Sequence, residues 1–190
     1  CGAGPGHIRA LSSALEGYCV PAVRPRPVCV SGPRSVLALS PDMPLTPVGE
    51  RINPTGKPAL RKALREGDFE PALDLARKQR AAGAAILDVN CGTGETDEAA
   101  ALSGAVEWLS AMVPSPLSID SSDPAAMEAA LRRYPGRALM NAVCAKAGVM
   151  EHLLDLCVRY GAVPILLPVG DSLPPVSAEE RMAVLDTMLS

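Results

Sequence analysis

The sequence is poor in aromatic residues. One tryptophan, one phenylalanine and three tyrosines occur among 190 residues. Proteins that bind single-stranded nucleic acids use aromatic side chains on which the bases stack. The 18 basic and 21 acidic residues also form no basic block. The composition therefore argues against a nucleic-acid partner.

Histidine is scarce, and the cysteines are not paired in sequence. The two histidines, His7 and His152, are too few for a histidine-rich metal site and do not support a Ser-His-Asp triad. The six cysteines include no C-x-x-C pair. We interpret them as mostly buried thiols in a reducing compartment rather than as a disulfide framework.

Long apolar runs and nucleotide-binding motifs are also missing. No run approaches the roughly 20 apolar residues that a membrane span needs, and no signal peptide is evident. Gly56-Lys57-Pro58 has proline where a phosphate loop needs serine or threonine, and Gly92-Thr93-Gly94 lacks the third glycine of a dinucleotide motif. These absences predict a soluble, cytoplasmic protein without a membrane partner.

The first 46 residues differ from the rest of the chain. Residues 1–17 have no initiating methionine and run from a glycine-rich turn into a short helix, and we interpret them as the end of an upstream domain. Residues 18–46 are rich in proline, which excludes long helices. The β-prone runs Val28–Val30 and Val36–Leu39 predict a small hairpin, so that 18–46 would be an interdomain linker.

From residue 47 onward, apolar strands alternate with amphipathic helices, which predicts an α/β fold with a parallel sheet. Capping signals mark the helices: Gly67 closes one, Asp123-Pro124 opens another, and Ser177 with Glu180 forms a capping box. Spacing alone does not separate an open doubly wound sheet from part of a (βα)8 barrel. The five predicted strands are 48–52, 85–90, 116–120, 138–141 and 164–169.

Polar residues stand at the ends of four predicted strands. Because the carboxyl ends of parallel strands meet at one edge of a sheet, we expect these side chains to converge. Their carboxylates and amides suit a neutral heterocycle with an amide-like edge. Two simpler interpretations stay open, in which Asn53 is only a turn residue and Asp120 only orders its loop. The residues are Asn53, Asp88, Asn90, Asp120 and Asn141.

The motifs that surround these residues resemble the pterin-binding domain of cobalamin-dependent methionine synthases. The resemblance covers about residues 47–190. The wider superfamily, which has a (βα)8 barrel, also contains dihydropteroate synthases and corrinoid methyltransferases. The motifs are Val48–Gly56, Gly83–Asn90, Ser118–Ser122, Tyr134–Arg137 and Asn141.

The resemblance implies methyl transfer from 5-methyltetrahydrofolate to cobalamin and then to homocysteine, which yields methionine. It implies pterin contacts from Asn53, Asp88, Asp120 and Asn141, with Asn90 a weaker candidate. Asp120 and Asn141 would be the catalytic pair, because the amine nitrogen that releases the methyl group must be protonated.

The N-terminal segment resembles the close of a homocysteine-binding zinc barrel, in which Cys1 would be one zinc ligand. With five of eight strands, an incomplete zinc site and no cobalamin signature, we expect an internal fragment of an incomplete (βα)8 barrel that is inactive alone. Cobalamin- and homocysteine-binding domains would complete it. The alternatives are an enzyme related to dihydropteroate synthase and an inactive truncated half barrel.

Overall fold

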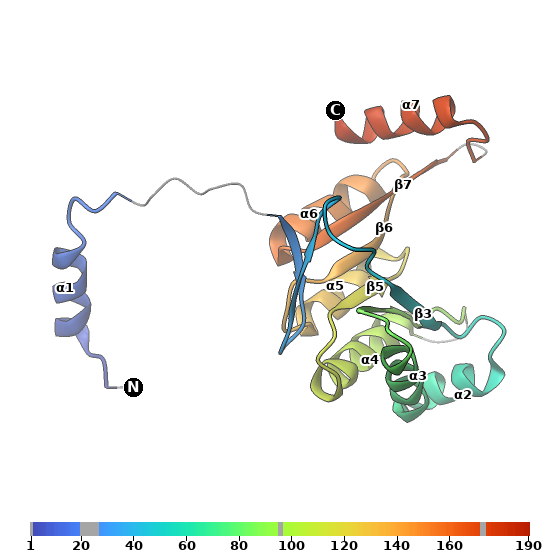
Figure 1. The fold of residues 1–190 in the computed structure, drawn as a ribbon, viewed down its shortest axis with the longest axis horizontal. Helices are drawn as coiled ribbons and strands as arrows, with labels where there is room; N and C mark the ends of the chain where they lie inside the picture. The colour runs from blue at the N-terminus through green and yellow to red at the C-terminus, as the bar shows by residue number, and fades with distance from the viewer. Residues whose placement is uncertain (1, 20–26, 95–96, 172–173) are drawn as a thin grey trace.

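The computed structural model describes residues 2–19, 27–94, 97–171 and 174–190 (Figure 1). It contains a two-stranded antiparallel hairpin and a five-stranded parallel sheet. The hairpin consists of β1 (Val28–Ser31) and β2 (Val36–Leu39). The sheet consists of β3 (Val48–Ile52), β4 (Ile86–Asn90), β5 (Leu117–Asp120), β6 (Leu139–Ala145) and β7 (Val163–Gly170).

The strand order separates the two architectures that the sequence left open. The order is β3-β4-β5-β6-β7, and each neighbouring pair is parallel. A doubly wound sheet reverses its strand order at a switch point, whereas strands that follow in sequence around one axis are typical of a (βα)8 barrel. The α/β prediction is confirmed, and the sheet has the order of a partial barrel.

Three helix ends lie where the capping signals in the sequence predicted them. Gly67 ends the second helix with φ 71°, in the left-handed region that glycine tolerates. Asp123 accepts a hydrogen bond from Ala125 N, and Ser177 and Glu180 form the predicted capping box. The helices after the hairpin are α2 (Pro58–Glu66), α3 (Glu70–Ala81), α4 (Glu98–Met112), α5 (Pro124–Arg133), α6 (Val149–Tyr160) and α7 (Ala178–Leu189).

The two faces of the sheet bury different residues. The outer face packs against the helices through Val89, Ile119 and Met140, which are fully buried in the main core. The inner face alternates with it along each strand. Near the amino ends of the strands this inner face is apolar, with Ile86 and Leu139 in a second, smaller cluster. Toward the carboxyl ends it becomes polar.

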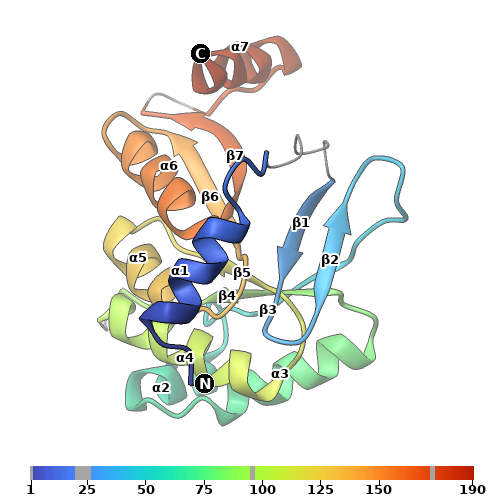
Figure 2. The ribbon, with the colours of Figure 1, turned by 90° about the vertical axis from the view of Figure 1, so that its left-hand side faces the viewer.

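The hairpin docks on the inner, apolar part of the sheet (Figure 2). Val30 is fully buried against Ile86 and Leu139. Ser31 N donates a hydrogen bond of 2.9 Å to Arg137 O, and Arg137 N donates one of 2.9 Å to Ser31 Oγ. The segment predicted as a linker hairpin therefore packs against the sheet, at the end opposite the polar residues.

The Tyr134 hydroxyl links the hairpin to the sheet through two hydrogen bonds. Its hydroxyl donates to Ser31 O at 2.8 Å and accepts from Leu117 N at 2.8 Å. Burial raises the pKa of this phenol to about 12, with the hydrogen bond from the Leu117 amide acting in the opposite direction. The hydroxyl therefore stays protonated at neutral pH and joins β1 to the first residue of β5.

We expect Tyr134→Phe to lower the free energy of unfolding by about 2 kcal/mol, because the substitution leaves the Leu117 amide and the Ser31 carbonyl without their partner. Tyr160→Phe is the matched control, since the Tyr160 hydroxyl donates to the half-buried Glu128 carboxylate, which also pairs with Arg132 and Arg159, and its removal should have a smaller effect. Urea denaturation of both variants measures the difference. Equal losses would contradict the role assigned to Tyr134.

Helix α1 (Pro5–Ala14) buries none of its residues, and Figure 1 shows it apart from the sheet. The division into 1–17, 18–46 and 47–190 stays a prediction. In the part of the chain that the structure describes, no helix combines the length and apolarity needed to cross a membrane.

Candidate functional site

The polar residues predicted from the strand ends lie at one edge of the sheet. Asn90 pairs in register with Asp120, and Asp120 pairs with Asn141. Asp88 lies two residues before Asn90, so its side chain points to the same face. Three neighbouring strands, β4, β5 and β6, therefore carry two carboxylates and two amides on the same face, at the carboxyl-terminal edge of the sheet.

Hydrogen bonds join these four side chains in two pairs. Asn90 Nδ2 donates to Asp120 Oδ2 at 3.1 Å, and Asn141 Nδ2 donates to Asp88 Oδ1 at 3.1 Å. The second bond passes from β6 to β4 and so spans β5. We call these four residues, Asp88, Asn90, Asp120 and Asn141, the strand-edge cluster. Within the cluster, each carboxylate accepts a hydrogen bond from one amide.

The environment of Asp120 favours its protonated form. Burial is the main cause, the bond from Asn90 opposes it, and the nearby acidic groups Asp88 and Glu98 add to it, so that the pKa rises from 3.8 to about 6. A carboxyl group with a pKa near neutrality can both accept and release a proton under physiological conditions.

Sequence reasoning missed Glu98, the first residue of helix α4. Ser121 Oγ donates a short hydrogen bond to Glu98 Oε1, and Ser121 N donates to Asn141 O at 3.0 Å. Asp123 N in turn donates to Ser121 Oγ at 3.1 Å. Glu98 and Ser121 therefore connect the segments that follow β4 and β5 with β6. The only sequence signal was an acidic first turn after Asp97, which caps the helix.

Asn53 is the first residue of the loop that follows β3. Its side-chain oxygen accepts a hydrogen bond of 2.9 Å from Thr55 N, and its main-chain oxygen accepts one of 3.0 Å from Lys57 Nζ. The first of these is the local turn that the simpler interpretation described. The structure thus joins four of the five predicted pterin residues directly and shows Asn53 ordering its own loop.

Ser118 lies within the inner face beside the strand-edge cluster. It pairs in register with Asp88 on one side and with Leu139 on the other. It is 1% exposed, and among the described residues its Oγ has no hydrogen-bond partner. A buried hydroxyl without a hydrogen-bond partner is unfavourable. Such groups are often found at functional sites.

The described residues do not form a metal site. No group of three His, Cys, Asp or Glu side chains is placed to hold an ion within the described ranges, and the proposed zinc ligand Cys1 lies outside them. Burial, with the charge of Glu98 as a smaller cause, raises the pKa of Cys91 to about 12, so this thiol stays protonated at neutral pH. The zinc ligand assigned to Cys1 therefore stays a prediction.

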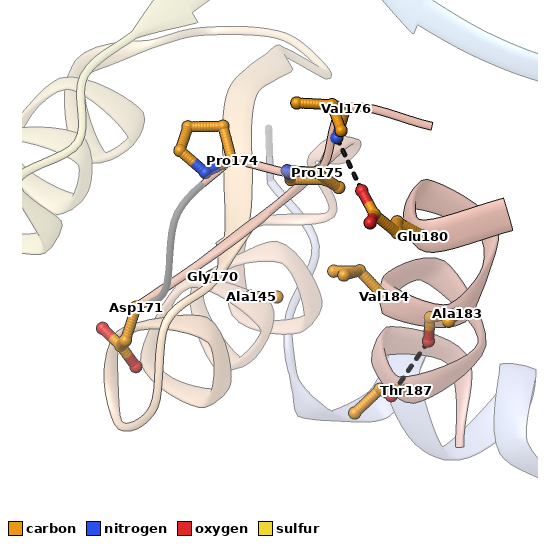
Figure 3. Close-up of a pocket in the computed structure, with 10 residues that line it drawn as sticks. All are labelled: Ala145, Gly170, Asp171, Pro174, Pro175, Val176, Glu180, Ala183, Val184 and Thr187. Atoms are coloured by element: carbon orange, nitrogen blue, oxygen red, sulfur yellow. Dashed lines mark hydrogen bonds between the residues drawn. The ribbon is translucent and has the colours of Figure 1, made fainter. Parts of the chain in front are cut away.

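A cavity of about 840 Å³ lies beside the carboxyl ends of β6 and β7, against helix α7. Figure 3 shows Val184 of α7 pointing toward Ala145, the last residue of β6. The two carboxylates that line the cavity are held by main-chain amides, since Glu180 accepts from Val176 N at 2.7 Å and Asp171 from Ala147 N at 3.3 Å. The cavity is therefore mainly apolar, and the strand-edge cluster holds the convergent polar groups that specific recognition needs.

Comparison with known proteins gives the family. The family model described as "Pterin binding enzyme" matches residues 49–186, which include all five strands of the sheet except the first residue of β3. A dihydropteroate synthase from Burkholderia cenocepacia is similar in structure, with a TM-score of 0.45 and 25% sequence identity over 74% of this chain. The chain spans 43% of the length of that enzyme. Because the family model matches well over half of the sequence, the chain belongs to the family of pterin-binding enzymes.

Proposed function

We propose that the strand-edge cluster binds the pterin ring of a reduced folate. A pterin carries a ring N–H and an amino group on one side and a carbonyl oxygen beside them, which together resemble an amide edge. A carboxylate accepts the two donors, and an asparagine amide complements the carbonyl. The observation that carries this proposal is the pair of Asp–Asn hydrogen bonds, because the same groups that satisfy each other can satisfy a pterin.

The reaction we propose is the first half of methionine synthesis. The methyl group leaves N5 of 5-methyltetrahydrofolate for cobalamin(I), and N5 takes up a proton as the bond to carbon breaks. Cobalamin, held by another domain, supplies the nucleophile, and homocysteine is the final acceptor. Asp120 would donate the proton that N5 takes up, for which a carboxyl pKa of about 6 is well placed, and the Asn141 amide would hydrogen-bond beside it.

The main alternative is condensation of a dihydropterin diphosphate, the chemistry of dihydropteroate synthases. Both reactions use a pterin, so the strand-edge cluster would serve either. The two differ in what lies beyond the ring, namely a methyl group at N5 in one case and a diphosphate in the other. A diphosphate would need basic residues near the cluster. The N-terminal segment that resembles the end of a homocysteine barrel favours methyl transfer.

We expect 5-methyltetrahydrofolate to shift the amide resonances of Asp88, Asn90, Asp120 and Asn141 when the chain is titrated with it. Nuclear magnetic resonance detects binding into the millimolar range, which matters because we expect this chain to bind folate more weakly than micromolar. The matched ligand control is p-aminobenzoylglutamate, which is the folate without its pterin. The dihydropterin diphosphate serves as the second probe.

Shifts that map to helix α1, or equal shifts with p-aminobenzoylglutamate, would contradict the pterin site. Stronger binding of the dihydropterin diphosphate than of 5-methyltetrahydrofolate would overturn methyl transfer in favour of the dihydropteroate synthase reaction.

A further inference from the structure

Ser118 lies on β5, beneath the hydrogen bond that joins Asn141 to Asp88. Asn141 Nδ2 reaches Asp88 Oδ1 across strand β5, and Ser118 is the β5 residue in register with Asp88. It lies two residues before Asp120, so its side chain points to the same face as the cluster. With 1% of its surface exposed, Ser118 is buried next to Asp88, its in-register neighbour on β4.

Asp88 accepts a hydrogen bond from Asn141, and the Asp120 side chain is also within hydrogen-bond reach of it. The Asp88 side chain is 4% exposed, and a buried carboxylate is unfavourable unless hydrogen bonds satisfy its oxygens. If Asn141 turns to a ligand, Asp88 loses its bond to Nδ2. Another donor must then replace that bond, or the binding energy of the ligand is reduced by the unsatisfied carboxylate.

The Ser118 hydroxyl has the freedom to be that donor. Among the described residues no partner holds its Oγ, and a hydroxyl hydrogen rotates to suit its surroundings. We propose that Ser118 is a positioning residue. Its hydroxyl donates a hydrogen bond to Asp88 when the Asn141 amide turns from Asp88 to a bound pterin. This inference rests on the proposed function, and it gives a role to a buried hydroxyl that has no partner among the described residues.

The test is the substitution Ser118→Ala with Ser110→Ala as its matched control. Ser110 is 3% exposed, and its Oγ also lacks a partner among the described residues, but it lies on helix α4 in the outer layer. We expect the dissociation constant for 5-methyltetrahydrofolate to rise about tenfold in the Ser118 variant, the effect of one lost hydrogen bond to a charged group. The Ser110 variant should bind as the unaltered protein does.

Stability without ligand separates positioning from a structural role. Both substitutions remove an unsatisfied buried hydroxyl, so we expect the urea midpoint of each variant to stay unchanged or to rise. In the complex, the Ser118 hydroxyl should lie within hydrogen-bond distance of the Asp88 carboxylate. A Ser118 variant that binds as tightly as the unaltered protein, or that loses affinity together with stability, overturns the inference. If the unaltered protein itself shows no pterin binding, the proposed site fails, and the inference fails with it.

Discussion

Replacing Asp120 with asparagine is expected to weaken pterin binding by about a hundredfold, since a neutral amide cannot make the charge-assisted hydrogen bond that a carboxylate makes with the protonated N5. Asn90 would keep its bond, because an asparagine oxygen can accept from its Nδ2 in the same place. The loss would therefore arise at the ligand and not from collapse of the strand-edge cluster.

The same substitution should make the protein more stable at neutral pH. The pKa of Asp120 rises to about 6 on folding, mainly through burial. Between about pH 4 and 6 the folded protein then binds more protons than the unfolded chain, so the free energy of unfolding falls as pH rises through this window. Above it the charged carboxylate stays unfavourable, and asparagine removes that charge.

Thermal unfolding at pH 7.5 and pH 4 measures this effect. We expect the Asp120→Asn variant to melt at a higher temperature than the unaltered protein at pH 7.5, and the difference to shrink at pH 4. Asp74→Asn, at an exposed ion pair with Arg77, is the control and should alter neither binding nor the pH dependence. A variant that binds pterin normally would remove Asp120 from the site.

The substitution Gly136→Ala, in the segment between α5 and β6, is expected to be strongly destabilising. A Cβ at this position would lie 2.2 Å from Ser31 O, a main-chain atom that cannot swing aside. The hairpin would have to separate from the segment that precedes β6, which we expect to lower the free energy of unfolding by about 3 kcal/mol.

Hydrogen exchange locates the damage, because Ser31 N donates to Arg137 O only while the hairpin is docked. That amide should exchange much faster in the variant, and the amides of β4 and β5 should change less. Gly32→Ala probes the other side of the contact, since its Cβ would lie 2.7 Å from Pro114 O. Gly6→Ala, with no atom within 4 Å, is the control. Unchanged exchange at Ser31 would contradict the docking.

The sequence predicted the sheet and most of the cluster because both follow from local rules. Apolar strands, Gly67, Asp123 and the Ser177 box are read from neighbouring residues, and strand ends meet in any parallel sheet. Glu98 and Ser118 were missed because their roles come from neighbours distant in sequence, such as Ser121 in one case and Asp88 in the other. The turn at Asn53 was one of two interpretations, and only coordinates show which groups its oxygen contacts.

The sequence also did not predict where strand β6 ends. The prediction stopped at Asn141, where a polar residue interrupts the apolar run, yet the strand continues to Ala145. Its register with β7 shifts between Met140 and Val143, so the ladder resumes after an irregularity that a strict two-residue alternation cannot describe. Such irregularities are common next to functional sites.

The docked hairpin also constrains the order of folding. Ser31 and Arg137 are 106 positions apart, so β1 cannot reach its place until the chain through β6 has been made and the sheet has begun to assemble. Closing so long a loop is entropically unfavourable before the sheet exists. We therefore expect docking of the hairpin to be a late kinetic step, during which Val30, Ile86 and Leu139 are exposed to water and to other chains.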